Sequence, residues 1–359
     1  VGPAWGLKNF WINEGHSFGI TAAGGAGWQL AEWIVDGEPT IDMLGVEPRR
    51  YGDYCSKSYL IKKNEEAYSH VFINHFPDEE RPAARPLRTA PCYDRMKNLG
   101  AVFGQKFGWE RPNFFAVDGM EQKDDWSFRR SKWFEAVEKE CKNVRENAGV
   151  LDGSTLGKIE IKGKDALAFM NLIYTNSFSK MKPGSSRYAL MLGEDGMVKD
   201  DGIICKISDE HFIATTTTGG AATVLGCMEE YAQTEWPNLN VYMNSITEQY
   251  ATFNISGPKT RNIIEKVFPE VNFSNEAFPF MTFQFHEYED TPIRILRASF
   301  TGEMGYEIYV PSNQALKIWE KIISFGKEFG LKPYGTETMH LLRAEKGYII
   351  VGQDTDGSI

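Results

Sequence analysis

The sequence predicts an α+β fold of mostly antiparallel sheets with helices. Strands and helices are interleaved along residues 130–345, without the regular βαβ rhythm of a doubly wound sheet. Residues 187–207 predict a hairpin, because two strand-like runs flank the turn Glu194-Asp195-Gly196. From residue 250 onward, the same alternation of predicted strands and helices is seen again. These observations favour two similar mixed modules over one parallel sheet.

The individual elements follow from apolar periodicity and from turn and capping residues. We expect helices at 132–147, 164–175, 219–233, 259–267, 312–329 and 335–345. We expect strands at 157–163, 187–192, 198–206, 211–217, 250–256, 293–300 and 306–310.

The first hundred residues differ in texture from the rest. Residues 9–35 predict a short aromatic strand, a glycine-rich turn and a helix that ends at Asp36-Gly37. Residues 46–105 are charged and interrupted by prolines, so we expect a connecting module with few regular elements. Just after it, Trp109 and Phe114 are expected to pack in a core rather than to take part in chemistry.

Composition excludes several classes of protein. The chain of 359 residues is 42% hydrophobic and 25% charged, which is typical of a folded protein with two or three domains. Its net charge of -10 disfavours a nucleic-acid binder. We expect no membrane span, because no apolar run reaches about 18 residues. The five cysteines form no CxxC pair, which predicts free thiols in the cytoplasm, or in the mitochondrial matrix of a eukaryote.

Both ends of the chain predict a piece of a longer polypeptide. The sequence begins with Val1 rather than methionine, shows no signal peptide, and already reads as the middle of a domain. It stops directly after a strand-like run. We therefore expect further segments on either side.

The predicted hairpin carries the first candidate for chemistry, Asp201. Its place beside the apolar pair Ile203-Ile204 leaves two interpretations, a solvated residue flanking the turn or a carboxylate that points into a cavity. Tyr188 on the neighbouring strand either faces the same space or packs in the core with its hydroxyl at the rim.

Glu303 is the second candidate, since it stands between Gly302 and Gly305 in a stretch that alternates like a strand. A carboxylate accepts two parallel N–H bonds, and flanking glycines let a flat ring approach closely. In the alternative interpretation the glycines form a bulge, and Glu303 caps it in solvent.

The helix at 335–345 carries the third candidate, Arg343, and Thr336 is expected to cap that helix. Arg343 either binds an acid of a ligand or of the protein, or pairs at the surface with Glu345 or Glu337. His340 stands alone, so we expect a structural histidine and no metal site.

The glycine-rich turn predicted within residues 9–35 allows two interpretations. It either binds an anion or the polar edge of a ring, or its small residues only allow the helix to pack closely under the strand.

Six motifs between residues 130 and 359 carry a family resemblance. They read GVLDGSTLGKIEIKGKDALAF, YTNSFSKMKPGSSRYALMLGEDGMVKDDG, TTTTGGAA, NEAFPFM, FTGEMGYEIYVP and YGTETMHLLRAEKGYIIVGQDTDG. They resemble the folate-binding aminomethyltransferase module of the glycine-cleavage T-protein, in the version found on N-methylglycine-oxidising flavoenzymes. The last three are especially similar to the α chain of heterotetrameric sarcosine oxidase.

The first 105 residues resemble single-chain dimethylglycine and sarcosine dehydrogenases instead. HSFGITAAGGAGWQLAEWIVDGEPTIDM looks like the end of their flavin domain, and EPRRYG through GWERPNFF looks like the linker that follows. The resemblance thus implies a FAD-domain remnant at 1–45, a linker module at 46–105, and aminomethyltransferase subdomains at 106–249 and 250–359. The dinucleotide-binding part would precede this chain, and the family's closing barrel would follow it.

The resemblance also implies roles for single residues. Asp201 matches the catalytic aspartate beside the reactive nitrogens of tetrahydrofolate, Glu303 the glutamate that holds the pterin edge, and Tyr188 and Arg343 folate-pocket positions. The loop that approaches the FAD ring matches Gly15, His16, Ser17, Phe18, Gly19 and Ile20.

The implied activity is demethylation of an N-methylated glycine at FAD, with capture of the one-carbon unit as 5,10-methylene-tetrahydrofolate. The implied partners are the small-molecule substrate and an electron-transfer flavoprotein or partner subunits. Two alternatives stay open: a stand-alone aminomethyltransferase without a redox step, and a folate-binding module without chemistry.

Overall fold

The computed structural model describes residues 1–355, which fall into two compact units. The first unit is Val1–Asn74 together with Arg81–Arg85, and the second is His75–Glu80 together with the chain from Pro86 onward. We describe each unit by itself.

The first unit is small and loosely packed. Strands β1 (Gly2–Pro3) and β2 (Trp11–Ile12) pair antiparallel, and helix α1 (Gly19–Asp36) ends at Gly37, whose φ of 91° suits glycine. Helix α2 (Lys57–Ser69) begins at Ser56, whose hydroxyl accepts a hydrogen bond from the backbone N–H of Tyr59. Two 3-10 turns (Leu44–Val46 and Pro48–Arg50) lie between them. The buried core consists of Val1, Trp33 and Met43.

Two predictions for this unit need correction. The glycine-rich stretch does not form the turn before the helix, because Gly24, Gly25 and Gly27 lie inside α1. A Cβ atom added at any of the three would meet nothing within 4 Å, so close packing does not explain them either. The connecting module expected at 46–105 also contains more structure than predicted, namely helix α2 in this unit, and helix α3 (Tyr93–Asn98) and most of strand β3 (Ala101–Lys106) in the second.

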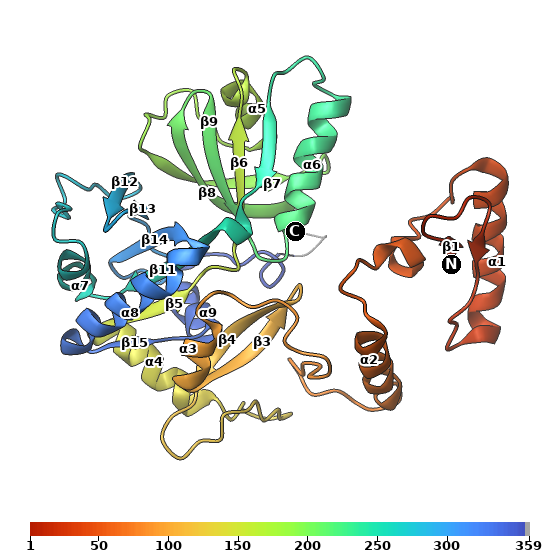
Figure 1. Ribbon diagram of the computed structural model, residues 1–359, viewed down its shortest axis with the longest axis horizontal. Coiled ribbons are helices and arrows are strands. Elements are labelled where there is room, and N and C mark those ends of the chain that lie inside the picture. Colours follow the sequence, from red (N-terminus) through yellow and green to blue (C-terminus); the bar gives the residue numbers. More distant parts are fainter. Residues whose placement is uncertain (356–359) are drawn as a thin grey trace. The chain divides into compact units, whose positions relative to one another are not determined.

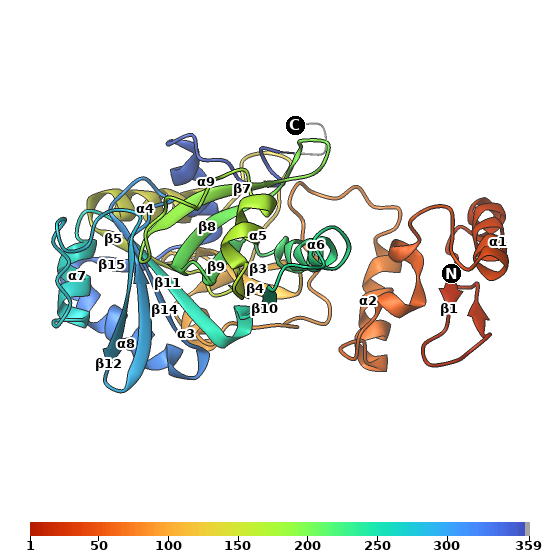
Figure 2. The ribbon, with the colours of Figure 1, turned by 90° about the horizontal axis from the view of Figure 1, so that it is seen from above.

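The second unit contains a five-stranded sheet in the order β10-β6-β9-β8-β7, and all of its neighbouring strands run antiparallel. Its strands are β6 (Gly157–Lys162), β7 (Ser186–Leu192), β8 (Val198–Ser208), β9 (His211–Thr216) and β10 (Tyr242–Ser245). Helices α5 (Ala166–Ile173) and α6 (Ala221–Thr234) cover one face, where they bury residues such as Ile159, Ile204 and Phe212 (Figures 1 and 2).

A six-stranded sheet in the order β12-β13-β14-β11-β5-β15 completes the second unit's core. Its strands are β5 (Ala148–Asp152), β11 (Tyr250–Ser256), β12 (Phe283–Tyr288), β13 (Thr291–Leu296), β14 (Gly305–Pro311) and β15 (Leu331–Pro333). Helices α7 (Thr260–Val267) and α8 (Ala315–Gly326) pack on one face, over Phe253, Ile295 and Ile308. Only the β5–β15 pair in this sheet is parallel, within the described residues.

The faces of the two sheets that these helices leave free meet each other. Cys205 and Ile213 of the five-stranded sheet form one buried cluster with Leu296 and Tyr309 of the six-stranded sheet. Around this core lie the hairpin of β3 (Ala101–Lys106) and β4 (Trp109–Phe115) and the helices α3 (Tyr93–Asn98), α4 (Phe134–Glu146) and α9 (Thr336–Ala344). Two sheets therefore face each other across a shared interior.

The predicted fold class is confirmed, since helices combine with mostly antiparallel sheets. Several elements were not predicted, namely β1, β3, β4, β5, β10, β12, β15, α2 and α3. The strand expected at 293–300 is too long, because β13 ends at Leu296. Trp109 and Phe114 pack in the interior as expected. The boundaries of the four predicted domains stay a prediction.

Candidate functional site between two sheets

Asp201 lies on the face of the five-stranded sheet that turns toward the six-stranded sheet. Side chains alternate along a strand, so Asp201 shares its face with Ile203 and Cys205 of β8. Cys205 packs against Tyr309 in the cluster between the sheets. By the same alternation, Glu307 of β14 lies on the face that bears Tyr309. The two carboxylates therefore belong to opposing sheet faces.

Tyr188 and Asp201 are brought together, in agreement with the interpretation in which both face the same space. The Tyr188 hydroxyl donates a hydrogen bond of 2.7 Å to Oδ2 of Asp201. Burial raises the pKa of Asp201, and this hydrogen bond partly opposes the rise. Burial also raises the pKa of Tyr188, with the Asp201 carboxylate as a second cause, so the phenol stays a donor. Asp201 is thus a partly buried carboxylate held by one neutral donor.

Asp200, which the sequence analysis did not single out, points to the opposite face and is 2% exposed. Its carboxylate accepts the backbone N–H of Thr217, and a Cβ atom on Gly220 would come within 2.6 Å of it. Burial raises its pKa to about 6. Asp200 therefore stabilises the turn before α6. Because side chains alternate between the two faces of a strand, the sequence Lys199-Asp200-Asp201 already indicated that the two aspartates point to opposite faces of the sheet.

Glu303 has a protein partner in this structure. Arg145 of α4 donates a hydrogen bond of 2.7 Å to the Glu303 carboxylate, and the same guanidinium pairs with Glu345. The strand β14 begins only at Gly305, so Glu303 lies in the turn before it, a quarter exposed. Glu303 is therefore neither in the strand nor a solvent cap.

The two glycines beside Glu303 are explained by contacts within the protein. Gly302 has a φ of +80°, and a Cβ atom there would lie 2.1 Å from the side chain of Lys346. A Cβ atom on Gly305 would lie 2.4 Å from the carbonyl oxygen of Ala298. The close approach that the sequence suggested is that of Lys346 and of the neighbouring backbone.

Arg343 is buried and holds the segment that follows α9. It donates to the carbonyl oxygen of Tyr348 at 2.9 Å, pairs with the Asp354 carboxylate, and reaches Gln353 at 3.4 Å. Its acid is thus Asp354 of the protein, and the surface pairs with Glu345 or Glu337 do not form. Thr336 does not cap α9, because the N-cap is Gly335 and makes no side-chain hydrogen bond.

Glu307 and its neighbours form a polar cluster between the sheets that the sequence analysis missed. Its carboxylate accepts from the Tyr309 hydroxyl and from Nδ2 of Asn254 at 3.2 Å. Burial raises the pKa of Glu307. The Arg294 guanidinium stacks on the Tyr309 ring, 4.0 Å from its centroid. The sequence Tyr306-Glu307-Ile308-Tyr309 already showed a glutamate within an apolar strand. Nothing in the neighbouring sequence indicated that Asn254 and Arg294 would lie beside it.

This cluster contains buried polar atoms without a hydrogen-bond partner in the described structure: Oγ1 of Thr252, Oδ1 of Asn254 and Nε of Arg294. Buried polar atoms are rarely left unpaired in a folded protein. The inner faces of the two sheets therefore carry buried donors and acceptors that are unpaired within the described residues.

The loop expected to approach FAD lies in the first unit and is mostly exposed. His16 hydrogen-bonds through Nε2 to the side chain of Asn13 at 2.7 Å, and Gly15 has a φ of +81°. Phe18 precedes α1 and makes no side-chain cap, so backbone N–H groups of the first helical turn stay available to a ligand.

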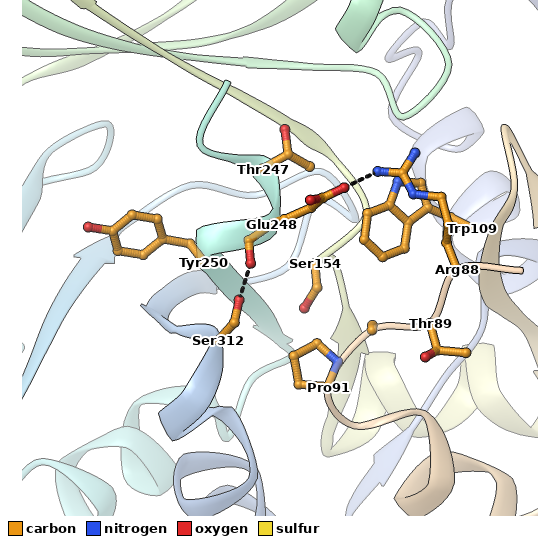
Figure 3. Close-up of a pocket in the computed structure, with 10 residues that line it drawn as sticks. Arg88, Thr89, Pro91, Trp109, Ser154, Thr247, Glu248, Tyr250 and Ser312 are labelled. Carbon is orange, nitrogen blue, oxygen red and sulfur yellow. Dashed lines mark hydrogen bonds and ion pairs between the residues drawn. The ribbon is translucent and has the colours of Figure 1, made fainter. Parts of the chain in front are cut away.

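A further pocket of about 300 Å³ lies within the second unit (Figure 3). Arg88 stacks on Trp109 and pairs with Glu248 in its wall, and Ser312 donates to the Glu248 carbonyl oxygen at 2.6 Å. Ser154, in the turn between β5 and β6, also lines it. None of the site residues predicted from the sequence lines this pocket, although Trp109, which was expected only to pack in a core, does.

The described residues contain no cluster of three or more His, Cys, Asp or Glu that could hold a metal ion. His340 is partly buried, and burial lowers its pKa to about 4. All five cysteines are free in the described part. Within residues 1–355, none of the helices has both the length and the apolarity to span a membrane.

Comparisons with known proteins agree with this architecture. A family model described as the GCVT N-terminal domain matches residues 92–359, and one described as the FAD dependent oxidoreductase central domain matches residues 36–90. The glycine cleavage system aminomethyltransferase T of Bartonella henselae has a similar fold, with a TM-score of 0.61 and 24% identity. That similarity covers 75% of this chain and 65% of the other.

Two relatives show how the chain relates to longer proteins. Sarcosine oxidase subunit alpha of Corynebacterium sp. strain U-96 is 49% identical over 76% of this chain and 27% of its own length. Mitochondrial dimethylglycine dehydrogenase of Mus musculus is 33% identical over 99% of this chain and 40% of its own length. The chain therefore spans less than half of each of these relatives.

Proposed function

Since this chain belongs to the GCVT N-terminal domain family, we propose that it is the tetrahydrofolate-binding part of a flavin-dependent enzyme that demethylates an N-methylated glycine. The Tyr188–Asp201 pair on the inner sheet face is the observation that carries this proposal. The flavin part is supported by the match of residues 36–90 and by relatives named sarcosine oxidase and dimethylglycine dehydrogenase.

The residues between the sheets fit a folate. A reduced pterin presents adjacent N–H donors and a carbonyl, and the unpartnered Thr252, Asn254 and Arg294 atoms offer acceptors and a donor. When bound, tetrahydrofolate would supply the secondary amines that take up the one-carbon unit. A carboxylate near β14 would hold the pterin edge, as Glu303 was predicted to do.

Glu307 competes with Glu303 for this role. The Glu303 carboxylate accepts from the charged Arg145, whereas the Glu307 carboxylate accepts from the neutral groups of Tyr309 and Asn254 and has unpartnered polar atoms nearby. If Glu303 bound the pterin, its carboxylate would have to accept from the ligand as well as from Arg145, or break the hydrogen bond with Arg145. Arg343 would act in the pocket by holding residues 348–354 in place.

Asp201 would accept and return a proton at the nitrogen that bonds to the one-carbon unit. Its carboxylate is partly buried, and burial raises its pKa toward the range in which a base exchanges protons efficiently. Tyr188 fixes the orientation of the carboxylate by donating to one oxygen, which leaves the other free for substrate. A positioned base typically contributes ~10²–10⁴-fold to a rate.

The loop of residues 15–20 would approach the flavin. The free N–H groups at the start of α1 can donate to the carbonyl or N1 edge of an isoalloxazine ring. FAD would accept the hydride equivalent from the amine, and most of its contacts would come from other parts of the whole protein. An electron-transfer flavoprotein or partner subunits would take the electrons onward, in the cytoplasm or in the matrix.

A stand-alone aminomethyltransferase is the second candidate, and the fold shared with the T-protein favours it. The match of residues 36–90 to an oxidoreductase domain argues against it. A flavin absorbance spectrum of the whole protein distinguishes the two.

The proposed function is tested by Asp201→Asn in the whole enzyme, with the product of each turnover measured. We expect the variant to release formaldehyde in place of methylene-tetrahydrofolate. The exposed residue Asp195, in the turn of the same hairpin, provides the control Asp195→Asn, which should keep the wild-type products. Wild-type folate coupling in Asp201→Asn would remove Asp201 from the mechanism.

A further inference from the structure

Lys158 lies on the same inner sheet face as Asp201, although it is only 1% exposed. It pairs in register with Thr215 of β9, and the Thr215 hydroxyl accepts the backbone N–H of Ile203 at 2.8 Å. Neighbouring strands are about 4.8 Å apart, so the backbones of Lys158 and Ile203 are separated by about 10 Å. Lys158 is therefore part of the interior in which we place the folate.

The hydrogen bonds of Lys158 suit a neutral amine. Nζ donates to the carbonyl oxygens of Ser154 at 3.0 Å and of Leu156 at 2.8 Å. No third acceptor lies within hydrogen-bond distance among residues 1–355. A neutral amine has two N–H donors, which these carbonyls satisfy, and its lone pair then points away from them.

Burial is the main reason why the Lys158 amine is partly neutral near neutral pH, since it lowers the pKa to about 7. The Asp152 carboxylate opposes this change, and Arg294 and Glu307 of the facing sheet act in opposite directions on it. Oδ2 of Asp152 is buried and has no partner in the described structure, so the Asp152 carboxylate does not form an ion pair with Lys158 there.

A pocket large enough for a small molecule lies next to residues that hydrogen-bond to Lys158. Ser154, whose carbonyl oxygen accepts from Nζ, lines the pocket of about 300 Å³ (Figure 3). Thr247 lines the same pocket, and its hydroxyl accepts the backbone N–H of Lys158 at 3.0 Å. Only the turn between β5 and β6 thus separates the pocket from the amine.

A purely structural lysine in the same sheet looks different. Lys206 of β8 is 2% exposed, donates to the carbonyl oxygen of Phe178 at 3.2 Å, and pairs with Asp209 at 2.6 Å. The Lys206 amine thus has a carboxylate as a direct ion-pair partner. Lys158 has no ion pair of this kind within the described chain.

We propose that Lys158 is a nucleophilic amine that captures formaldehyde or an aldehyde of similar size and holds its carbon for transfer to an amine acceptor. This inference rests on the proposed function, because that function supplies both the one-carbon unit and the acceptor.

The reaction balances without an oxidant or a reductant. Lys158 first loses a proton to solvent. The Nζ lone pair then bonds to the carbonyl carbon, and a second proton moves from Nζ to the carbonyl oxygen, forming a carbinolamine. The hydroxyl leaves as water with a proton taken from solvent, and an iminium remains on Lys158. An acceptor amine bonds to this carbon and passes its proton to Nζ. The C–N bond to Nζ then breaks, its electron pair returns to Nζ as a neutral amine, and the carbon stays on the acceptor as an iminium.

The test is reductive trapping of the purified protein with dilute ¹³C-formaldehyde and cyanoborohydride near neutral pH, followed by peptide mass spectrometry. We expect ¹³C-methyl groups on Lys158 at least about tenfold faster than on Lys206, because each unit by which a pKa falls raises the neutral fraction about tenfold. Lysine-to-arginine replacement at position 158 (Lys158→Arg) should remove this label and leave that of the surface lysines unchanged.

Labelling of Lys158 no faster than that of Lys206, while surface lysines are labelled, would overturn the proposal. This comparison uses the wild-type protein, so it decides even if the variant does not fold. Tetrahydrofolate binding, measured separately by calorimetry, distinguishes the two proposals. Labelling without folate binding would contradict only the proposed function, and folate binding without labelling would contradict only the role of Lys158.

Discussion

Replacing Tyr188 with phenylalanine should raise the pKa of Asp201. The change removes the hydroxyl that donates to Oδ2 at 2.7 Å and keeps the aromatic ring. Burial already raises the pKa of Asp201, and the Tyr188 hydrogen bond is the main opposing cause. Without it, the ionised carboxylate loses stabilisation and the proton is held more tightly.

The size of the effect follows from the exposure of the pair. A hydrogen bond to a charged group contributes about 1.5–3 kcal/mol. Tyr188 is 44% exposed, so water replaces part of the lost bond and the lower end of this range applies. At about 1.4 kcal/mol per unit, the pKa should rise by about one unit. The acidic limb of any activity that needs ionised Asp201 should move up by the same amount.

The assay is an NMR titration of the protein with ¹³C-labelled aspartate carboxyls, with the Asp201 signal assigned by its loss in Asp201→Asn. Tyr231→Phe is the matched control, since the Tyr231 hydroxyl donates to exposed Glu194 at 3.2 Å on the outer side of the same module. It should leave the Asp201 titration unchanged. An unchanged titration in Tyr188→Phe would refute the assigned role of the hydrogen bond.

Three further predictions concern carboxylates and their partners. In calorimetry, Glu307→Gln should weaken tetrahydrofolate binding more than Glu303→Gln does, because the Glu303 carboxylate already forms an ion pair with Arg145. A larger loss of affinity in Glu303→Gln would instead assign the pterin contact to Glu303. Burial raises the pKa of Glu140 to about 7 from its ordinary 4.5, so the folded protein holds a proton there that the unfolded chain releases. The free energy of unfolding in urea should therefore fall as the pH rises through this range, and a fall of equal size in Glu140→Gln would exclude this cause. Thr338→Val removes the hydroxyl that donates to Glu140 at 2.6 Å and should cost about 1–3 kcal/mol, whereas a melting temperature no lower than that of the exposed control Thr234→Val would contradict this.

Local patterns predicted the fold class and much of the second unit. Apolar periodicity predicted the bounds of β6, β8, β11, α4 and α7 closely. In each of these elements the apolar side chains recur at the spacing of a strand or a helix, because one face packs in the core. β5 was missed because Val150 and Leu151 are both buried, so the short run shows no alternation after helix α4. The helical glycines of α1 were misread because glycine usually signals a turn.

Long-range contacts account for what the sequence could not show at the site. Register in the hairpin brought Tyr188 and Asp201 together, and that contact is local enough to predict. Arg145 lies 158 residues from Glu303, and Lys346 covers Gly302 from the turn after α9, so neither could be inferred from the FTGEMGYEIY stretch. Glu307 and Lys158 stand in strands whose facing partners only the folded chain reveals.

Calorimetric titration of this chain with tetrahydrofolate under reducing conditions tests the central claim most directly. The account predicts one folate per chain, with protection from exchange of the backbone N–H groups in β8 and β14, the strands that carry Asp201 and Glu307. Binding without protection of either strand, or no binding by a chain that melts cooperatively, would contradict a folate site between the two sheets.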